Sequence, residues 1–174
     1  MPDPVYNFLL AFYRSVYGTH LDHYRDAQGS RVFVNNRYNK MKTITIMGQL
    51  YRSKEARSRR GVHAQVLYEA EDRGEPIAWL CEIQYFFRHE LKIDAQLKEH
   101  VFAFVRWHSI YSSNESLFVD EYLKTWRSHF LAEDMHCIVP IHRLYSQVAV
   151  VKYGDQTHAN GRTVVIPLPK KMLA

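Results

Sequence analysis

The sequence predicts a mainly β protein, a barrel or sandwich with one amphipathic helix near its N-terminus. Roughly seven to nine short β-rich runs follow one another, polar turn residues separate them, and apolar residues near the N-terminus recur with helical spacing. A chain of 174 residues, 47% of them hydrophobic, is long enough to bury one core. Because no repeat, linker or low-complexity tract divides it, we expect a single domain over residues 1–174.

The first element is a helix over residues 4–17. Asp3 is a good N-cap, Pro4 suits the first helical position, and Gly18 can end the helix with a left-handed residue. An amphipathic helix must bury its apolar face, most simply against a sheet. That face is expected to contain Val5, Phe8, Leu9, Phe12 and Val16, widened by Tyr6, Tyr13 and Tyr17.

Strands make up most of the remaining chain. Gly48 is expected to form a bulge or bend that continues the second strand as far as residue 52, and residues 71–76 have the composition of a hairpin turn. Residues 118–130 fit a helix through the spacing of Phe118, Tyr122 and Trp126, although no clear cap precedes them. The expected strands are residues 31–35, 42–47, 62–69, 77–89, 100–108, 137–145, 147–153 and 162–168.

The charge is polarised along the chain. The formal net charge is +5, but one short segment holds five cations against the single carboxylate of Glu55, whereas acidic residues gather between residues 69 and 75. We expect this basic segment to bind the phosphates of DNA; the alternative is a solvated surface loop. Its cations are Arg52, Lys54, Arg57, Arg59 and Arg60.

Several classes of protein are disfavoured. No apolar run approaches the ~18 residues that a membrane-spanning helix needs, and the start of the chain does not look like a signal peptide. Two isolated cysteines, Cys81 and Cys137, cannot form a disulfide framework or a cysteine-rich zinc module. We expect both to be buried thiols of a protein in a reducing compartment.

No motif for catalysis is present. The sequence contains no G-x-S-x-G, no Walker loop, no G-x-G-x-x-G and no H-E-x-x-H, and the ten histidines are poorly spaced for a metal ion. We therefore expect a non-enzymatic protein without a metal or cofactor. The alternative is a metal-dependent nuclease or transposition accessory domain that uses scattered histidine and glutamate residues.

Aromatic residues supply the second candidate site. Tyr85, Trp107 and Tyr111 fall near strand ends or beside polar residues, where aromatic rings can enclose a methylated ammonium group or stack on bases. The competing interpretation is that such rings form the core, and it is strongest for Trp79 and Trp107. Tyr111, which lies in a polar stretch, is the best candidate for an exposed position.

Three segments resemble the core of the bromo-adjacent homology (BAH) domain. They are LCEIQYFF at residues 80–87, FAFVRW at 102–107 and CIVPIHRL at 137–144. More narrowly, the chain resembles BAH-like modules of mobile-element proteins in mucoralean fungi, through the SKEAR, IQYFF and IVPIHR segments and the closing PLPKK. This resemblance covers residues 42–173, and residues 1–41, the helix and its lead-in, match only loosely.

The resemblance implies an SH3-like β-barrel with one or two short helices besides the first one. It also implies a nuclear protein that binds chromatin, either DNA or a histone peptide, and possesses no catalytic activity. A structural or oligomerisation domain within a larger protein is the remaining alternative, and the sequence leaves it open.

Overall fold

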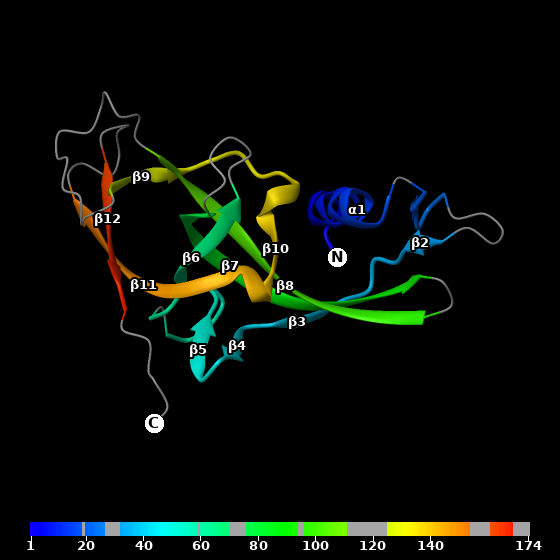
Figure 1. The fold of residues 1–174 in the computed structure, drawn as a ribbon, viewed down its shortest axis with the longest axis horizontal. Coiled ribbons are helices and arrows are strands. Elements are labelled where there is room, and N and C mark those ends of the chain that lie inside the picture. Colours follow the sequence, from blue (N-terminus) through cyan, green and yellow to red (C-terminus); the bar gives the residue numbers. More distant parts are fainter. Residues whose placement is uncertain are drawn as a thin grey trace.

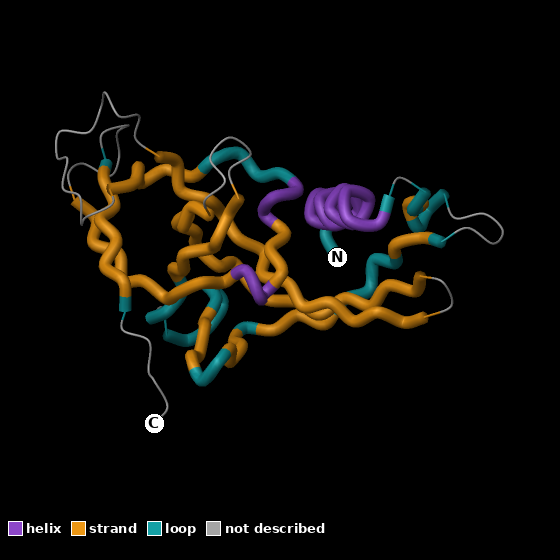
Figure 2. Tube along the Cα trace, in the orientation of Figure 1, coloured by secondary structure: helices purple, strands orange, loops and turns teal. Residues whose placement is uncertain are grey.

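The computed structural model describes residues 1–18, 20–26, 32–58, 60–69, 76–93, 96–110, 125–153 and 161–168. Over these ranges the chain is mainly β, as predicted, with one α-helix and two short 3-10 helices (Figures 1 and 2). In chain order the elements are α1 (Asp3–Tyr17), β1 (Asp22–His23), β2 (Phe33–Val34), β3 (Asn39–Met41), β4 (Thr43–Ile46), β5 (Gln49–Arg52), β6 (His63–Glu69), β7 (Pro76–Ile93), β8 (Gln96–Ile110), β9 (Thr125–Phe130), η1 (Met135–Cys137), β10 (Ile138–Pro140), η2 (Ile141–Arg143), β11 (Leu144–Tyr153) and β12 (Arg162–Pro167).

The largest sheet joins eight strands in the order β10-β8-β9-β12-β11-β6-β7-β3. Because β8 pairs with β7 as well, the strands β8, β9, β12, β11, β6 and β7 close into a ring of hydrogen-bonded neighbours, and β10 and β3 are attached to it. All the pairings in this sheet are antiparallel. A parallel pair, β1–β2, and a hairpin, β4–β5, are separate from it.

The long β7–β8 hairpin belongs both to the strand ring and to the part of the molecule that contains α1. It is paired from Cys81↔Trp107 to Ile93↔Gln96, with one irregularity between Ile83 and Tyr85. One end of this ribbon belongs to the strand ring, and the other end extends away from it beside α1 (Figure 1). The core contains side chains from both strands together with the buried face of α1.

Helix α1 begins one residue earlier than expected, and Pro2 occupies the N-cap position that we assigned to Asp3. The predicted end at Gly18 is confirmed, with a φ of 99°. The buried face is rotated from the expected one, because Val16 is 55% exposed and Leu10 is buried. Tyr6 and Tyr13 lie on the buried face because their hydroxyl groups have hydrogen-bonding partners inside the protein.

The expectation that Gly48 merely bends a strand was wrong. The chain reverses there, so that Ile46 pairs with Gln49 across a turn made by Met47 and Gly48. Both turn residues have a positive φ, which a two-residue hairpin turn of the I′ type requires. Residues 39–41, which lie outside the expected strands, form an edge strand on β7, a position that tolerates polar side chains.

Two later expectations also need correction. Residues 125–130, the described part of the expected helix, form strand β9, and Trp126 packs with Leu80 and Val165 in a second small core. The expected strand 137–145 is interrupted by η2, because Pro140 lacks the N–H that would extend the β10–β8 pairing. Its last residues belong instead to β11, which continues through residue 153.

Candidate functional site

The structure gives the two described aromatic candidates different surroundings. Tyr85 is buried, and its ring packs against Phe87 and Phe104 while the ammonium group of Lys40 lies 4.1 Å from the ring centroid. Burial raises the pKa of the Tyr85 hydroxyl above its ordinary value. A cation of the protein itself thus covers this ring, which lines none of the hollows described below. Tyr111 lies outside the described residues.

Trp107, by contrast, lines a hollow of about 400 Å³. Its aromatic partners there are Trp79 of β7 and Tyr68 of β6, two residues that the sequence analysis did not assign to a site. Strand pairing brings the three together, because Val66 pairs with Trp79 and Cys81 with Trp107 on neighbouring strands. We call this hollow the aromatic pocket; its remaining walls are Leu131, Ala132, Asp134 and His136.

Hydrogen bonds hold both indole rings of the aromatic pocket in place. Nε1–H of Trp79 donates to the carbonyl oxygen of His108 over 3.0 Å, and that of Trp107 donates to the carbonyl oxygen of His136 over 3.1 Å. Trp79 also packs against Trp126 with a centroid distance of 5.5 Å. Since the polar edges of both rings are satisfied within the protein, the pocket is formed before any ligand arrives.

One acidic side chain lies at the rim of the aromatic pocket. Asp134 is exposed, and its Oδ1 accepts a hydrogen bond from the backbone N–H of His136 over 2.8 Å, which caps η1. The cap fixes the carboxylate next to the aromatic walls. The pocket therefore combines π faces with one negative charge, a pairing that suits a cation.

A second hollow adjoins the aromatic pocket and shares Tyr68, Trp107 and His136 with it. Its volume is about 560 Å³, and it extends to α1, where Phe12 and Val16 form part of its wall. The exposure of Val16 is explained by this position. The two hollows thus share three of their lining residues, and the second one lies between α1 and residues of β6 and β10.

The basic segment is divided by its contacts. The guanidinium group of Arg52 is bonded to the carbonyl oxygen of Arg60 over 3.5 Å, and Nζ of Lys54 lies 3.2 Å from a carboxylate oxygen of Glu82. Arg57 and Arg60 are exposed, and neither has an ion-pair partner among the described residues. Arg59 lies outside the described residues. Lys42, exposed next to this segment, is a cation that the sequence analysis did not include.

Glu82 is held as a carboxylate by its neighbours. Burial alone would raise its pKa, but hydrogen bonds from Gln84 and Lys54 outweigh that effect, and the pKa lies below its ordinary value. The adjacent His63 has its pKa lowered to about 4, chiefly because it is buried. Among the described residues no three histidine, cysteine, aspartate or glutamate side chains gather as metal ligands.

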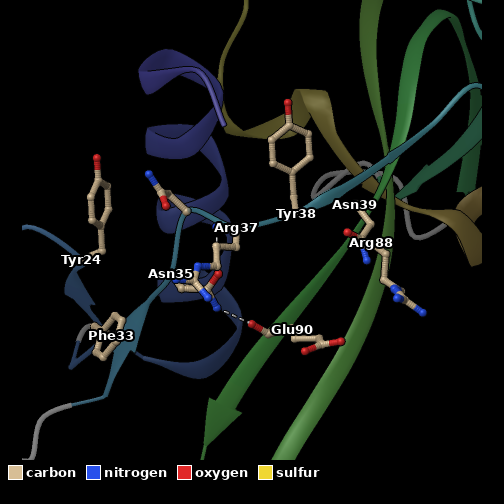
Figure 3. A pocket seen from close by; sticks show the side chains of 9 residues that line it. Tyr24, Phe33, Asn35, Arg37, Tyr38, Asn39, Arg88 and Glu90 are labelled. Carbon is tan, nitrogen blue, oxygen red and sulfur yellow. Dashed lines mark hydrogen bonds between the residues drawn. The ribbon is translucent and has the colours of Figure 1, made fainter.

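A third hollow, of about 530 Å³, lies where the segment after β2 crosses β7 (Figure 3). Its polar walls include Arg37, which has no ion-pair partner among the described residues, and Arg88, which pairs with Glu99 at 3.3 Å. The Asn35 side chain donates to the carbonyl oxygen of Glu90 over 2.8 Å and fixes the crossing. No feature of the sequence had indicated this hollow.

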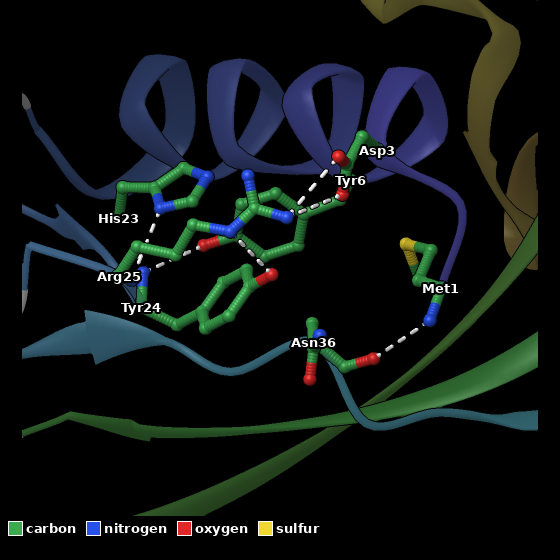
Figure 4. Close-up of polar contacts among 7 residues, drawn as sticks. All are labelled: Met1, Asp3, Tyr6, His23, Tyr24, Arg25 and Asn36. Atoms are coloured by element: carbon green, nitrogen blue, oxygen red, sulfur yellow. Dashed lines mark hydrogen bonds and ion pairs between the residues drawn. The ribbon is translucent and has the colours of Figure 1, made fainter.

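The same segment is tied to the start of α1 (Figure 4). The N-terminal ammonium group donates to the carbonyl oxygen of Asn36 over 3.1 Å, and the guanidinium group of Arg25 bonds both carboxylate oxygens of Asp3. Arg25 also donates to the hydroxyl of Tyr24 over 2.9 Å. These contacts attach the wall of the third hollow to the helix.

No family model matches the chain, and neither a curated protein nor a solved structure matches it. Within the described ranges, no helix has both the length and the apolar character needed to cross a bilayer.

Proposed function

We propose that the protein is a non-enzymatic, nuclear chromatin-binding module with a BAH-like, SH3-like barrel fold, and that its aromatic pocket binds a methylated lysine of a histone peptide. One observation carries the proposal: the indole rings of Trp79 and Trp107 are held by internal hydrogen bonds and line a hollow beside the carboxylate of Asp134. The closed strand ring is compatible with the proposed barrel fold.

The chemistry of the aromatic pocket favours a cation that cannot donate many hydrogen bonds. A trimethylammonium group has no N–H, so it gains little from carbonyl acceptors and much from π faces, each worth about 0.5–2 kcal/mol. An unmodified lysine would lose its hydration in this apolar hollow without recovering its hydrogen bonds. Asp134 adds attraction for the positive charge, and the adjoining second hollow has room for residues that flank the modified lysine.

The test compares peptides that carry trimethyllysine with peptides that carry its neutral carbon isostere, using the whole chain and isothermal titration calorimetry. We expect the charged peptide to bind about ten-fold more tightly than the isostere. Asp134→Asn should reduce that preference several-fold, because asparagine preserves the cap of η1 but removes the charge. Tyr85→Phe is the matched control, since Tyr85 does not line the pocket, and should bind like the wild type. Equal affinity for the isostere, or no binding of any methylated peptide, would contradict the proposal.

Contact with DNA phosphates is the second candidate function, and it is favoured by the exposed guanidinium groups of Arg57 and Arg60, which have no ion-pair partner in the part of the chain that the structure describes. Each phosphate that a cation neutralises on duplex DNA adds about −0.9 to the slope of log affinity against log salt. Replacing both arginines by alanine should therefore flatten the slope by roughly two.

Lys54→Ala is the matched control for this second function. Lys54 lies in the same segment, but its ammonium group is engaged by Glu82, so its removal should flatten the slope much less. The readout is fluorescence anisotropy of a labelled duplex between 50 and 200 mM salt. An unchanged slope in the double variant would leave the segment as ordinary surface.

A further inference from the structure

The turn between β4 and β5 has an unusual residue at its tip. Met47 and Gly48 connect Ile46 to Gln49 with φ values of 47° and 75°, and Met47 is 94% exposed. Asparagine and glycine are the residues that such a turn prefers, because a side chain branching from a left-handed residue is strained. Met47 combines this backbone strain with an apolar side chain that is almost fully exposed to water. Neither the turn geometry nor packing within the protein therefore accounts for a methionine at this position.

The hairpin itself is firmly attached. Tyr51 of β5 is buried in the main core, and the backbone N–H of Ser53 donates to the carbonyl oxygen of Lys42 across the base of the hairpin over 2.9 Å. The side chain of Gln147 donates to the carbonyl oxygen of Leu50 over 2.6 Å. The tip points away from the large sheet (Figure 1). Met47 is thus presented by a supported ribbon.

Positive charges surround the base of this ribbon. Lys42 precedes β4, Arg52 ends β5, and Arg57 and Arg60 follow it, whereas the ammonium group of Lys54 is engaged by Glu82. Lys42 directly precedes Thr43, and Arg52 is the cross-strand partner of Thr43, so one cation lies at the base of each strand of the hairpin. An apolar tip between two basic flanks matches the arrangement of a duplex, where stacked bases lie between two phosphate chains.

We propose that the β4–β5 hairpin is a wedge, which enters the minor groove of duplex DNA and inserts Met47 between two base pairs. Four residues per strand give a ribbon of roughly 13 Å, long enough to cross a groove about 7.5 Å deep while its base contacts the phosphates. The minor groove of undistorted B-DNA is about 6 Å wide, narrower than a two-stranded ribbon, so entry requires the groove to widen as the kink forms. Methionine is among the apolar side chains that unstack a base step and kink the duplex in this way. This inference rests on the DNA-binding function proposed above.

A bilayer or an apolar protein surface fits the hairpin less well. A membrane-binding surface needs several large apolar side chains side by side. Among the described residues of this hairpin, only Met47 and Leu50 are large, apolar and exposed, and Leu50 is 39% exposed opposite the polar Thr45. Ile44 and Ile46 of β4 pack against the core. One thioether at the tip has the size of a wedge for one base step, and the flanking cations favour a polyanion.

The test separates bending of DNA from binding to it. A duplex of about 20 base pairs, containing a central TA step and a fluorophore at each end, is titrated with the whole protein, and energy transfer and anisotropy are recorded together. We expect energy transfer to rise on binding, because wedges of this kind bend DNA by about 20–90°. Met47→Asn should abolish that rise while the salt slope of the affinity stays unchanged.

Two controls make the result specific. Met47→Leu keeps a large apolar side chain and should retain the bend, whereas Leu97→Asn, at an exposed leucine of the separate β7–β8 hairpin, should have no effect on it. Thermal unfolding of Met47→Asn should occur at an equal or higher temperature than in the wild type, which excludes misfolding as the cause.

The possible failures are distinguishable. If the wild type binds DNA with the expected salt slope but does not bend it, the wedge is wrong and phosphate binding stands. If the wild type does not bind DNA even at 50 mM salt, both proposals fail. If Met47 instead governs binding to vesicles of anionic phospholipid in the absence of any DNA bend, the hairpin is a membrane contact and the wedge is overturned.

Discussion

The hydroxyl of Tyr13 lies 3.0 Å from Nδ1 of His89, and the opposite ring nitrogen of His89 lies 2.8 Å from the carbonyl oxygen of Asn35. Nε2 faces a carbonyl oxygen and must carry the proton, so Nδ1 accepts from the tyrosine. Both side chains are buried. One neutral imidazole thus connects α1, β7 and the segment that follows β2.

Removing the Tyr13 hydroxyl should destabilise the fold. In Tyr13→Phe the Nδ1 of His89 loses its donor inside the core, and a buried unsatisfied acceptor costs about 1–3 kcal/mol. Urea unfolding at pH 7.5 measures the difference. Tyr17→Phe is the matched control, because Tyr17 contacts His100 in a half-buried position, and it should cost clearly less. Equal losses in the two variants would contradict the assigned network.

Stability should fall as the pH is lowered from 7.5 to 5. Burial lowers the pKa of His63 to about 4 and lowers those of His89, His100 and His108 as well. The unfolded chain, with histidine pKa values near 6.5, then binds more protons than the folded protein, so acid favours unfolding.

His63 alone should account for about 2 kcal/mol of the loss between pH 7.5 and 5. His63→Gln should shrink the pH dependence of the free energy of unfolding by that amount. A wild-type stability that is flat over this interval would contradict the burial of these imidazoles.

The rotated face of α1 can be tested with a pair of variants. Leu9 is completely buried, and Leu9→Ala should cost about 2–5 kcal/mol in the free energy of unfolding. Val16 belongs to the apolar stripe that the sequence indicates, but it is 55% exposed, so Val16→Ala should cost less than about 0.5 kcal/mol. Similar losses of stability in the two variants would show that Val16 is buried like Leu9, as the sequence spacing predicted.

The two thiols should be unreactive in the folded protein. Cys81 and Cys137 are free and buried, and burial raises the pKa of Cys137 to about 11. The thiolate is the reactive form, so an aromatic disulfide reagent at pH 8 should label neither cysteine within minutes and both in denaturant. Rapid labelling of one thiol without denaturant would show that its surroundings open.

The sequence was sufficient where one local pattern decides the structure. The existence of a helix at residues 4–17 and of strands at 77–89 and 100–108 follows from local spacing, although the fold rotates the buried face of the helix and lengthens both strands. It was insufficient where tertiary pairing competes with that spacing. Trp126 has helical spacing with its neighbours, yet the chain buries it as part of a strand beside Leu80 and Val165.

The candidate sites follow the same division. The sequence indicated Trp107 as a site candidate because it lies near the end of an expected strand. Its partners Tyr68 and Trp79 lie on two other strands, and the register that brings these strands together cannot be read from any one segment of the sequence. The Met47–Gly48 reversal was missed because methionine is not a residue that two-residue hairpin turns prefer. The positive φ of Met47 is a property of the folded backbone and cannot be read from the residue type.

The contact of α1 with η1 and β10 has a consequence for synthesis on the ribosome. Tyr17 ends the helix and Met135 begins η1, so 117 residues (18–134) lie between two elements that pack together in the finished protein. At a synthesis rate of roughly 5–20 residues per second, about 6–24 seconds pass between translation of the helix and translation of the η1 and β10 residues that cover it. Phe12 and Val16, which line the second hollow together with Met135 and Ile138, belong to the part of the helix that stays uncovered during this interval.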